Sequence, residues 1–104
     1  MRRFGQHAIL KEDKIDEYVA LHAAVWPEVL SVITDCHLHN YSIYISGNEL
    51  FAYFEYNGND YDEDMRRMDE SDIMQSWWKH TKPCFLHHDT ATYYLDWKEI
   101  FHLE

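Results

Sequence analysis

The sequence has few residues that break or cross-link regular structure, since its 104 residues include only three glycines, two prolines and two cysteines. Hydrophobic residues make up 46% of the chain, which together with so little Gly and Pro indicates a compact globular protein without low-complexity tracts. No internal repeat and no linker-like stretch interrupts it, so we expect a single domain over residues 1–104. Cys36 and Cys84 have no metal-binding or redox spacing, and we expect reduced, packed thiols.

Positive charge is also scarce, because 9 Lys and Arg stand against 19 Asp and Glu and leave a formal net charge of -10. A surface of this charge repels phosphate backbones and anionic lipids, which disfavours nucleic acids and membrane surfaces as partners. The stretch MRRFGQHAIL lacks the long apolar run of a signal peptide, and no segment approaches the length of a membrane span. We therefore expect a cytoplasmic protein with a neutral or cationic small molecule as its ligand.

Several signatures of catalysis are missing too. The sequence has no Gly-rich phosphate loop and no signature of a Ser or Cys nucleophile. It contains eight histidines, but the pairs His37/His39 and His87/His88 lack a third ligand at a recognisable spacing such as HExxH. The residues alone therefore do not favour a bound metal ion.

The first third of the chain predicts a strand over Arg2 to Leu10 and then two helices. Asp13 is a suitable N-cap for a helix of about three turns, in which residues recur every three or four positions: Ile15, Tyr18, Val19, His22 and Val25. Pro27 disfavours helical geometry at Trp26 and suits the first turn of a helix. We therefore expect a break near Trp26 and a short helix over Pro27 to Cys36, with three residues facing inward: Val29, Leu30 and Ile33.

The stretch HNYSIYISGNELFAYFEY, residues 39–56, predicts a β-hairpin with a two-residue turn at Gly47-Asn48. Alternation puts three residues of the first strand on one face: Tyr41, Ile43 and Ile45. The returning strand has four residues on one face and two on the other: Leu50, Ala52, Phe54 and Tyr56 against Phe51 and Tyr53. Both faces of the hairpin are apolar or aromatic, so both need cover.

The remaining segments predict two more helices and a last strand. An acidic helix is expected over Asp60 to Glu70, and Ser71 can cap the next one. Trp77 and Trp78 are adjacent and cannot share a helix face, so each forms its own i,i+4 pair: Ile73 with Trp77, and Met74 with Trp78. We expect Pro83 to end this helix, a loop over Leu86 to Thr92, and a final strand over Tyr93 to Leu103.

The order of these elements predicts an α+β fold of the ferredoxin-like split βαβ type, a four-stranded antiparallel sheet with helices on one face. A chain of this length has no second layer to cover the aromatic outer face of the sheet. A second copy of the chain is the simplest cover. We therefore expect a homodimer with two sheets back to back, the architecture known as the dimeric α+β barrel.

One helical stripe has the residue types for chemistry. Tyr18, His22 and Trp26 follow one another at four-residue steps, which places an imidazole between two aromatic rings. A histidine in such a position is commonly a partly buried side chain satisfied by a carbonyl. The pattern by itself leaves the catalytic and the structural interpretation open.

Four stretches in series resemble the L-rhamnose mutarotase family: HAAVWPEVL (22–30), HNYSIY (39–44), WWKH (77–80) and EIFHLE (99–104). The resemblance covers nearly the whole chain. It implies a small cytoplasmic dimer of the architecture expected above, which interconverts the α and β anomers of L-rhamnose without a cofactor or metal. It also implies His22 as the proton donor, with four residues binding the sugar: Tyr18, Tyr41, Trp77 and Trp78.

Mutarotation suits these residue types, because one proton must leave the anomeric hydroxyl and another must reach the ring oxygen. His22 could carry both protons through water, or Tyr18 could share the work. We expect Trp26 and Glu28 to lie behind the sugar-contacting residues. Glu28 would then either orient the imidazole or interact only with the helix dipole.

Two other functions remain open at this stage. Cofactor-free and haem-degrading monooxygenases share the expected architecture, and a non-catalytic sugar-binding module would keep the same aromatic cleft. The residues also leave open whether the sugar is L-rhamnose, L-fucose or another deoxy-hexose.

Overall fold

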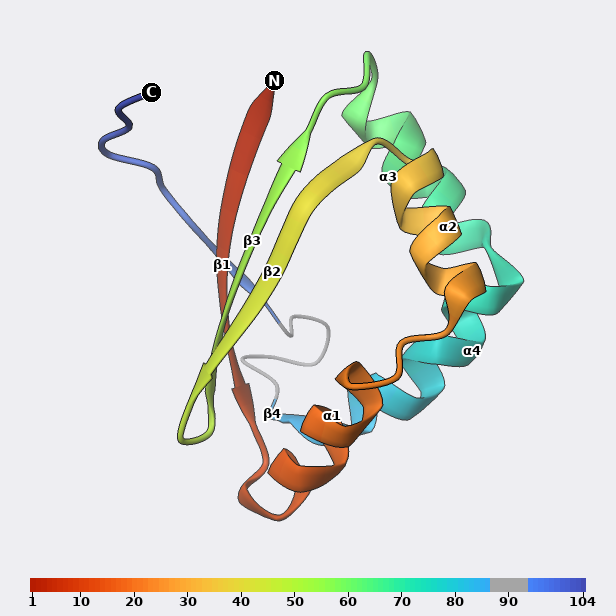
Figure 1. Cartoon of the computed structure of the whole chain (residues 1–104), viewed down its shortest axis with the longest axis vertical. Helices are drawn as coiled ribbons and strands as arrows, with labels where there is room; N and C mark the ends of the chain where they lie inside the picture. Colours follow the sequence, from red (N-terminus) through yellow and green to blue (C-terminus); the bar gives the residue numbers. More distant parts are fainter. Residues whose placement is uncertain (87–93) are drawn as a thin grey trace.

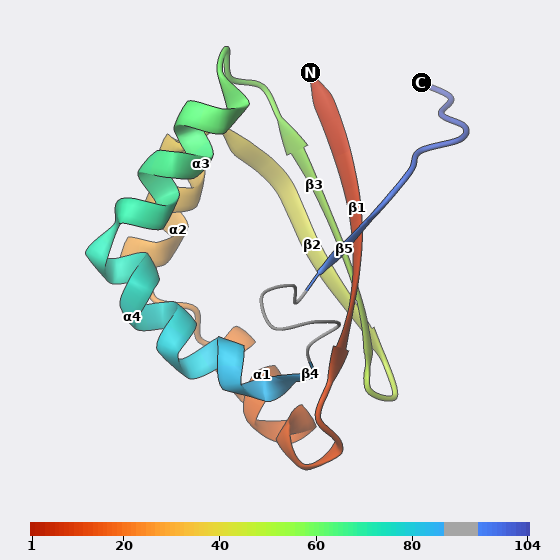
Figure 2. The same cartoon turned by 180° about the vertical axis from the view of Figure 1, so that it is seen from behind.

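In residues 1–86 and 94–104, the part of the chain that the computed structural model describes, five strands form one antiparallel sheet with four α-helices on one face (Figure 1). The view from behind shows the helices on that side of the sheet only (Figure 2). The elements follow in this order: β1 (Arg2–Leu10), η1 (Glu12–Lys14), α1 (Ile15–His22), α2 (Pro27–Asp35), β2 (Leu38–Ser46), β3 (Glu49–Tyr56), α3 (Tyr61–Glu70), α4 (Asp72–Thr81), η2 (Lys82–Cys84), β4 (Phe85–Leu86) and β5 (Leu95–Trp97). The architecture agrees with the predicted fold class.

Strand β1 lies inside the sheet and has three partners. Along one edge it pairs with β3 over nearly its whole length, and β3 pairs in turn with β2. The other edge is divided between two short strands, with β4 opposite Ile9 and Leu10 and β5 opposite Gly5 to His7. The fourth strand position of the split βαβ fold is thus occupied by two separate segments.

This division corrects the prediction for the end of the chain. Of the strand expected over Tyr93 to Leu103, the described residues 94–103 are paired only at Leu95–Trp97. Phe85–Leu86 forms a strand that the sequence pattern did not indicate. Residues 87–93, which include most of the expected loop and His87/His88, lie outside the described residues. Beyond Trp97 the apolar side chains find no partner layer among the described residues, since Ile100 is 90% exposed and Leu103 is 80% exposed.

The first helix begins later than predicted. Lys14 N–H donates to the Lys11 carbonyl at 2.9 Å, so the chain first forms the 3₁₀ turn η1, and the α-helix starts at Ile15. Asp13 therefore lies inside this turn and is not the N-cap. The predicted break at Trp26 is confirmed, since Trp26 is extended and Pro27 is the first residue of α2. Val29 is fully buried as expected, whereas Leu30 is 52% exposed and does not belong to the core.

The hairpin and the two later helices agree closely with their sequence signals. Gly47 adopts φ +59° in the predicted turn, a conformation that suits glycine. The Asp60 side chain accepts from Glu63 N–H at 3.2 Å to cap α3, and the Ser71 hydroxyl accepts from Met74 N–H at 3.4 Å to cap α4. Local side-chain capping thus sets the start of both helices.

A β-bulge in β2 decides which side chains of that strand face the helices. The pairing of β2 with β3 slips between His39 and Ser42, and Asn40 within the slip has φ +49°. Leu38 before the bulge is buried, and an unbroken alternation from Leu38 would place Tyr41 on the outer face. After the bulge, Tyr41 stacks on the buried Phe54 with ring centroids 5.1 Å apart. The extra residue therefore turns Tyr41 towards the helices.

Candidate active site

A cavity of about 680 Å³ lies between the helical layer and the sheet. Its volume falls within the range of small-molecule sites, roughly 300–1,000 Å³. The wall has apolar side chains with seven polar ones among them: Gln6, His22, Thr34, His39, Asn40, Tyr41 and Tyr61. In the part of the chain that the structure describes, no Asp, Glu, Lys or Arg lines this cavity.

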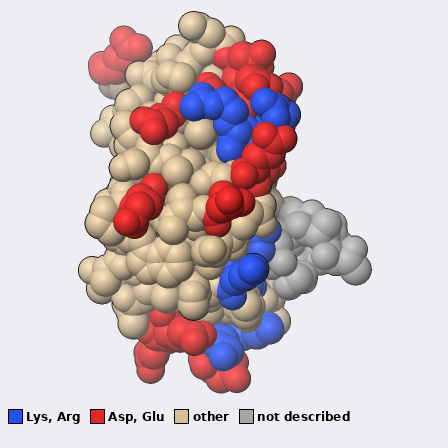
Figure 3. All heavy atoms as spheres, turned by 90° about the vertical axis from the view of Figure 1, so that its right-hand side faces the viewer, with Lys and Arg blue, Asp and Glu red and all other residues tan. Residues whose placement is uncertain are grey.

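The charged residues lie on the outer surface. On the helical side of the molecule, Lys and Arg lie beside Asp and Glu in groups separated by uncharged surface (Figure 3). On α3, for example, Arg66 pairs with Glu63 and Glu70, and Arg67 pairs with Asp64. An uncharged cavity in an acidic protein suits a neutral ligand, because no ionic group of the wall has to be desolvated when the ligand binds.

His22, the last residue of α1, lines the cavity with its two ring nitrogens in different surroundings. Nδ1 donates to the Tyr18 carbonyl oxygen, 2.9 Å away in the preceding helical turn. A carbonyl only accepts, so Nδ1 carries the hydrogen of the neutral ring and Nε2 carries the lone pair. Nε2 makes no hydrogen bond with the described residues. The carbonyl contact expected of a structural histidine is therefore present, but it leaves one nitrogen able to act on a ligand.

Tyr18 lies behind His22 and not on the cavity wall. Its ring packs on the imidazole with centroids 4.2 Å apart, and only 4% of the residue is exposed. Its hydroxyl lies 3.3 Å from that of Tyr94, which follows the undescribed segment. Burial raises the pKa of Tyr18 to about 12, so the phenol stays protonated at neutral pH. This position supports the imidazole but offers no base to share its work.

Tyr41 contributes a hydroxyl group to the cavity wall from β2. Desolvation, with smaller effects from Tyr94 and Tyr61, raises its pKa well above the ordinary value. The phenol is therefore neutral over the physiological range. In this form it can donate a hydrogen bond to a bound hydroxyl and also accept one.

Trp77 and Trp78 both line the cavity but differ in burial. Trp77 is 5% exposed and belongs to the main core cluster, whereas Trp78 is half-buried with the Lys82 ammonium 4.9 Å from its ring centroid. Trp77 meets the His22 ring edge-on at 5.6 Å. Trp26 lies behind it, with an edge-on contact to Trp77 at 5.2 Å. The two adjacent indoles thus lie in different environments, with Trp77 mainly in the core and Trp78 mainly on the cavity wall.

Glu28 does not take the orienting role considered for it. The residue is exposed in the first turn of α2 and makes no hydrogen bond or ion pair with the described residues. The imidazole of His22 is oriented instead by the Tyr18 carbonyl. Glu28 is left with a favourable interaction with the N-terminal end of the helix.

The cavity also contains residues to which the sequence reasoning gave no role in the site, notably Gln6, His39 and Tyr61. His39 Nε2 lies 2.9 Å from the Asn57 side-chain oxygen, at the start of β2. A signal for Gln6 was present in the alternation of β1, because Phe4, Gln6, Ala8 and Leu10 share one face and only Gln6 is polar. Among the described residues, no group of three or more potential metal ligands occurs, and no helix is long and apolar enough to cross a bilayer.

Comparison with solved structures places the fold among α+β proteins with a curled antiparallel sheet and helices on one face. A structure of L-rhamnose mutarotase from Formosa agariphila superposes with a TM-score of 0.80 at 22% identity, covering 100% of both chains. Tetracenomycin F2 cyclase from Streptomyces glaucescens, a type II polyketide cyclase, gives a TM-score of 0.71 at 7% identity, covering 100% of this chain and 98% of the other. These likenesses confirm the predicted α+β fold class.

Sequence comparison narrows this class to one family. The family model described as L-rhamnose mutarotase matches residues 3–103. A protein from Oceanobacillus iheyensis named L-rhamnose mutarotase is 35% identical over 107 aligned positions, which span 100% of both chains. The chain belongs to the L-rhamnose mutarotase family, and it is accordingly an enzyme of the isomerase class. The resemblance noted in the sequence is confirmed.

Proposed function

We propose that the cavity is the active site in which this member of the L-rhamnose mutarotase family interconverts the α and β anomers of L-rhamnose, with His22 moving the protons. The observation that carries the proposal is the state of the His22 ring. Its Nδ1 donates to the Tyr18 carbonyl, so Nε2 is left to act on a ligand in the uncharged cavity. The family supports the reaction, and the geometry of the wall supports the assignment of the residue.

The reaction needs one proton removed and one proton delivered. Nε2 of His22 takes the proton of the anomeric hydroxyl as C1 becomes a carbonyl, the C1–O5 bond breaks, and the ring oxygen receives a proton. Rotation about the C1–C2 bond turns the aldehyde over, and closure by the reverse steps gives the other anomer. Proton transfer by a positioned side chain typically contributes about 10²–10⁴-fold to such a reaction.

His22 is the best candidate for both proton transfers. Tyr18 and Tyr41 stay protonated because desolvation raises the pKa of each, and the described wall contains no carboxylate. An imidazole that has taken the proton from the anomeric oxygen becomes an acid that can return one to the ring oxygen, directly or through water. The cycle then needs neither a second side-chain base nor a cofactor.

The rest of the wall suits a 6-deoxy sugar. The indoles of Trp77 and Trp78 offer apolar surface for the methyl group and the C–H faces, while Tyr41 offers a neutral hydroxyl to a sugar hydroxyl. Trp26 supports the Trp77 ring from behind. We assign binding to Tyr41, Trp77 and Trp78, and assign Tyr18 and Trp26 to holding His22 and Trp77 in place.

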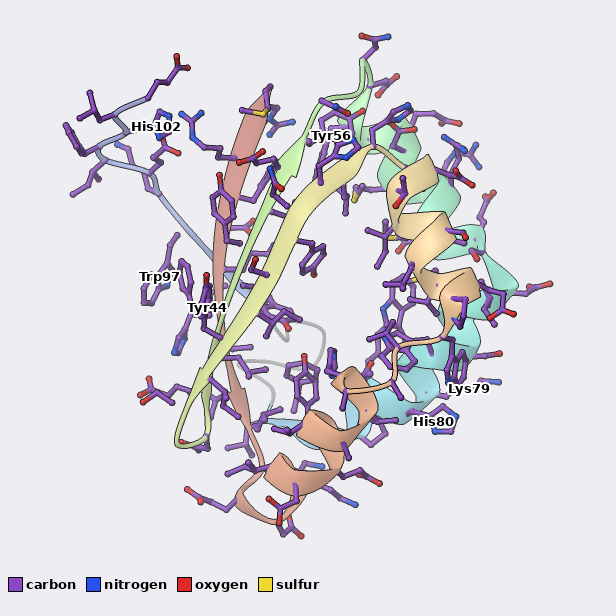
Figure 4. All side chains as sticks on the ribbon, viewed as in Figure 1. Tyr44, Tyr56, Lys79, His80, Trp97 and His102 are labelled. Atoms are coloured by element: carbon purple, nitrogen blue, oxygen red, sulfur yellow. The ribbon has the colours of Figure 1, made fainter. Side chains whose placement is uncertain are left out.

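We further infer that the enzyme is a cytoplasmic homodimer of single-domain chains, with the outer face of the sheet as the interface. Tyr44 on β2 is 65% exposed and Trp97 on β5 is 56% exposed, and both point away from the helices (Figure 4). Phe51 and Tyr53 lie between them on β3 and are half-buried. So much aromatic surface on one face of the sheet fits a second copy of the same face.

Saturation-transfer NMR on a panel of sugars tests the function directly, because it reports the rate of exchange between anomeric protons. The panel should contain L-rhamnose, L-fucose, L-mannose and D-glucose. We expect the enzyme to accelerate exchange most strongly for L-rhamnose. Sugar binding without accelerated exchange would favour a non-catalytic module, and a Soret shift on incubation with haem would favour a haem-degrading enzyme.

A further inference from the structure

Gln6 is a polar side chain in a row of apolar ones. On the face of β1 that looks towards the helices, Ala8 and Leu10 are fully buried and Phe4 stacks on Phe54, whereas Gln6 lines the cavity. A primary amide carries two N–H donors and one oxygen acceptor, and leaving these groups unsatisfied in an apolar wall is costly. Its presence in the wall of a ligand cavity therefore calls for partners.

Strand β5 supplies the first of these partners. The pairing of β1 with β5 sets Asp96 directly beside Gln6, and Gln6 Nε2 donates to Asp96 Oδ1 at 2.7 Å. A carboxylate only accepts, so this contact fixes which end of the amide is the NH2 group. The acceptor is also charged, and charge-assisted hydrogen bonds are shorter and stronger than neutral ones. Asp96 thus holds the amide in one orientation.

The held amide still has hydrogen-bonding capacity to offer. One N–H is used by Asp96, which leaves the oxygen and the second N–H without a partner among the described residues. Together they leave one acceptor and one donor for a ligand. A sugar hydroxyl, which both donates and accepts, is the complementary group.

The position of Gln6 relative to the proposed catalytic group suggests which part of the sugar it meets. His22 and Trp77 reach the cavity from the helical layer, whereas Gln6 reaches it from the sheet. On the same cross-strand row, Ala52 separates Gln6 from Ile43, which also lines the cavity. With neighbouring strands about 4.8 Å apart, this row spans about 10 Å of the sheet-side wall. His22 and Gln6 thus line the same cavity from opposite layers, so a sugar with its anomeric centre at His22 would have other ring hydroxyls on the side of Gln6.

We propose that Gln6 is a substrate-binding residue that recognises a ring hydroxyl away from the anomeric centre, and that Asp96 is a positioning residue that orients the Gln6 amide. The proposal rests on the cavity being the active site. It adds to the site a specificity contact that comes from the sheet and depends on residues 90 positions apart in the chain.

Kinetics of anomer exchange with variants at both positions test this proposal. Gln6→Leu should raise KM for L-rhamnose by about 2- to 12-fold, the reach of one net hydrogen bond, while kcat changes little. Asp96→Ala, at an exposed residue whose loss leaves the core intact, should raise KM in the same direction. Asp96→Asn keeps an acceptor oxygen and should restore most of the affinity. Gln75→Leu is the matched control, because Gln75 lies exposed on α4 with its amide on the Asp69 carbonyl.

Deoxy sugars identify the hydroxyl and exclude a general structural effect. The probes are the 2-, 3- and 4-deoxy forms of L-rhamnose. The form that lacks the hydroxyl bound by Gln6 should have the same KM with the parent enzyme and with Gln6→Leu. The role of Gln6 would be overturned if Gln6→Leu had the same KM as the parent for every sugar. It would also be overturned if the substitution raised KM equally for all of them. Failure of the parent to accelerate any anomer exchange would instead overturn the proposed function, and the substrate contact with it.

Discussion

Single residues in the cavity wall differ in the protons that they can exchange. Tyr18 and Tyr41 are held in their protonated forms by desolvation, which raises the pKa of both phenols. His22 has a lone pair on Nε2, because its Nδ1 hydrogen is engaged by the Tyr18 carbonyl. We therefore expect loss of the imidazole to affect the chemical step and loss of a phenol to affect mainly binding or packing.

Replacing His22 should separate catalysis from binding. We expect His22→Ala to fold and to bind L-rhamnose, because Tyr41 and the two tryptophans remain, but to lose about 10²–10⁴-fold in anomer exchange. His37→Ala should stay within a few-fold of the parent, since His37 contacts Asp64 and does not line the cavity. The same holds for His80→Ala, whose side chain lies on the outer side of α4 (Figure 4). Full exchange in His22→Ala, measured by saturation-transfer NMR, would refute the assignment.

Tyr18→Phe tests whether the phenol takes part in proton transfer. The pKa of Tyr18 is raised from its ordinary value to about 12, so the group stays neutral below about pH 11 and contributes no titration there. We expect the variant to keep exchange within several-fold of the parent, with the same pH profile between pH 6 and about pH 10. A loss of two orders of magnitude, or a shifted profile, would show that Tyr18 shares the work of His22.

The two tryptophans should respond differently to truncation. Trp77→Ala removes a side chain that is 5% exposed and packed in the core, which typically costs about 3–5 kcal/mol of stability. Trp78→Ala removes a half-buried ring and should lower the melting temperature less. Both variants should weaken sugar binding. Thermal melts and sugar titrations on the same samples measure the two effects, and unchanged affinity in both variants would remove the indoles from the binding site.

The sequence predicted much of this wall but not all of it. Helical spacing placed Tyr18 beside His22 correctly, but α1 ends at His22, so the second ring beside the imidazole is Trp77 and not the expected Trp26. The adjacent tryptophans required two different environments, which burial of Trp77 and partial exposure of Trp78 provide. Two features depended on contacts between distant segments. Tyr18 lies behind His22 partly because Tyr94 and Phe85 surround it, and Gln6 has its orientation from Asp96. Spacing along the chain carries no information on such pairs.

Elements with local signals were the easiest to predict. The Ser71 cap of α4, the break at Trp26 and the Gly47 turn depend on residues within a few positions, and all were confirmed. The Asp60 cap of α3 is equally local, but the sequence pattern had placed Asp60 inside the helix. The strands β4 and β5 were missed or drawn too long, because each is short and exists only where β1 offers an edge. The bulge in β2 was also not foreseen, although the face that it gives Tyr41 was.

A buried carboxylate joins the end of the hairpin to α3. Asp64, 6% exposed, accepts from the Tyr56 hydroxyl at 2.6 Å, from His37 Nδ1 at 3.0 Å and from Arg67 at 2.8 Å. Tyr56 reaches it from the end of β3, on the side of the sheet that faces the helices (Figure 4). These donors, Tyr56 first, lower the pKa of Asp64. The ionised form therefore favours the folded state.

Tyr56→Phe should lower the melting temperature in a pH-dependent way. The pKa of Asp64 is lower in the folded than in the unfolded chain, so its stabilising effect is full above the ordinary value near 3.9 and is lost as the pH falls through the folded value. The variant lacks the main cause of this shift. We expect the melting temperatures of the parent and of Tyr56→Phe to differ clearly at pH 7 and to differ less below about pH 4. A difference independent of pH would mean that the bond to Asp64 is not the cause, and that the loss comes from packing or from the Asp60 N–H donor, 3.0 Å from the Tyr56 hydroxyl.

At the scale of the whole molecule, one face of the sheet and the last residues have no covering layer among residues 1–86 and 94–104. Trp97 stacks on His7 on this outer face, with ring centroids 5.1 Å apart. The following segment is held to β1 by Glu99, which accepts two hydrogen bonds from Arg3 at 2.9 Å each. Ile100, Phe101 and Leu103 beyond it are 78–90% exposed. In the proposed homodimer, a second copy of the chain covers these side chains.

Charge substitutions on the two faces test the homodimer. Sedimentation at micromolar concentration should show a dimer for the parent chain. Tyr44→Glu places a charge on the outer face of the sheet and should give a folded monomer, because an unpaired charge in an interface is strongly unfavourable. Val19→Glu makes a similar change at a residue of α1 that is 48% exposed, and this variant should remain dimeric. A parent monomer, or a dimeric Tyr44→Glu variant, would contradict the proposed interface.

The division of the β1 edge between two late segments also has a consequence for the time course of synthesis. Gln6 and Asp96 are 90 positions apart, and the ribosome adds about 5–20 residues per second, so roughly 5–18 seconds separate their appearance. During most of this interval the N–H and C=O groups along that edge of β1 have no strand to pair with, because β4 emerges only about ten positions before Asp96. The nascent chain can complete its hairpin and helices first, but the wall of the cavity that contains Gln6 is completed only after residue 97 has emerged.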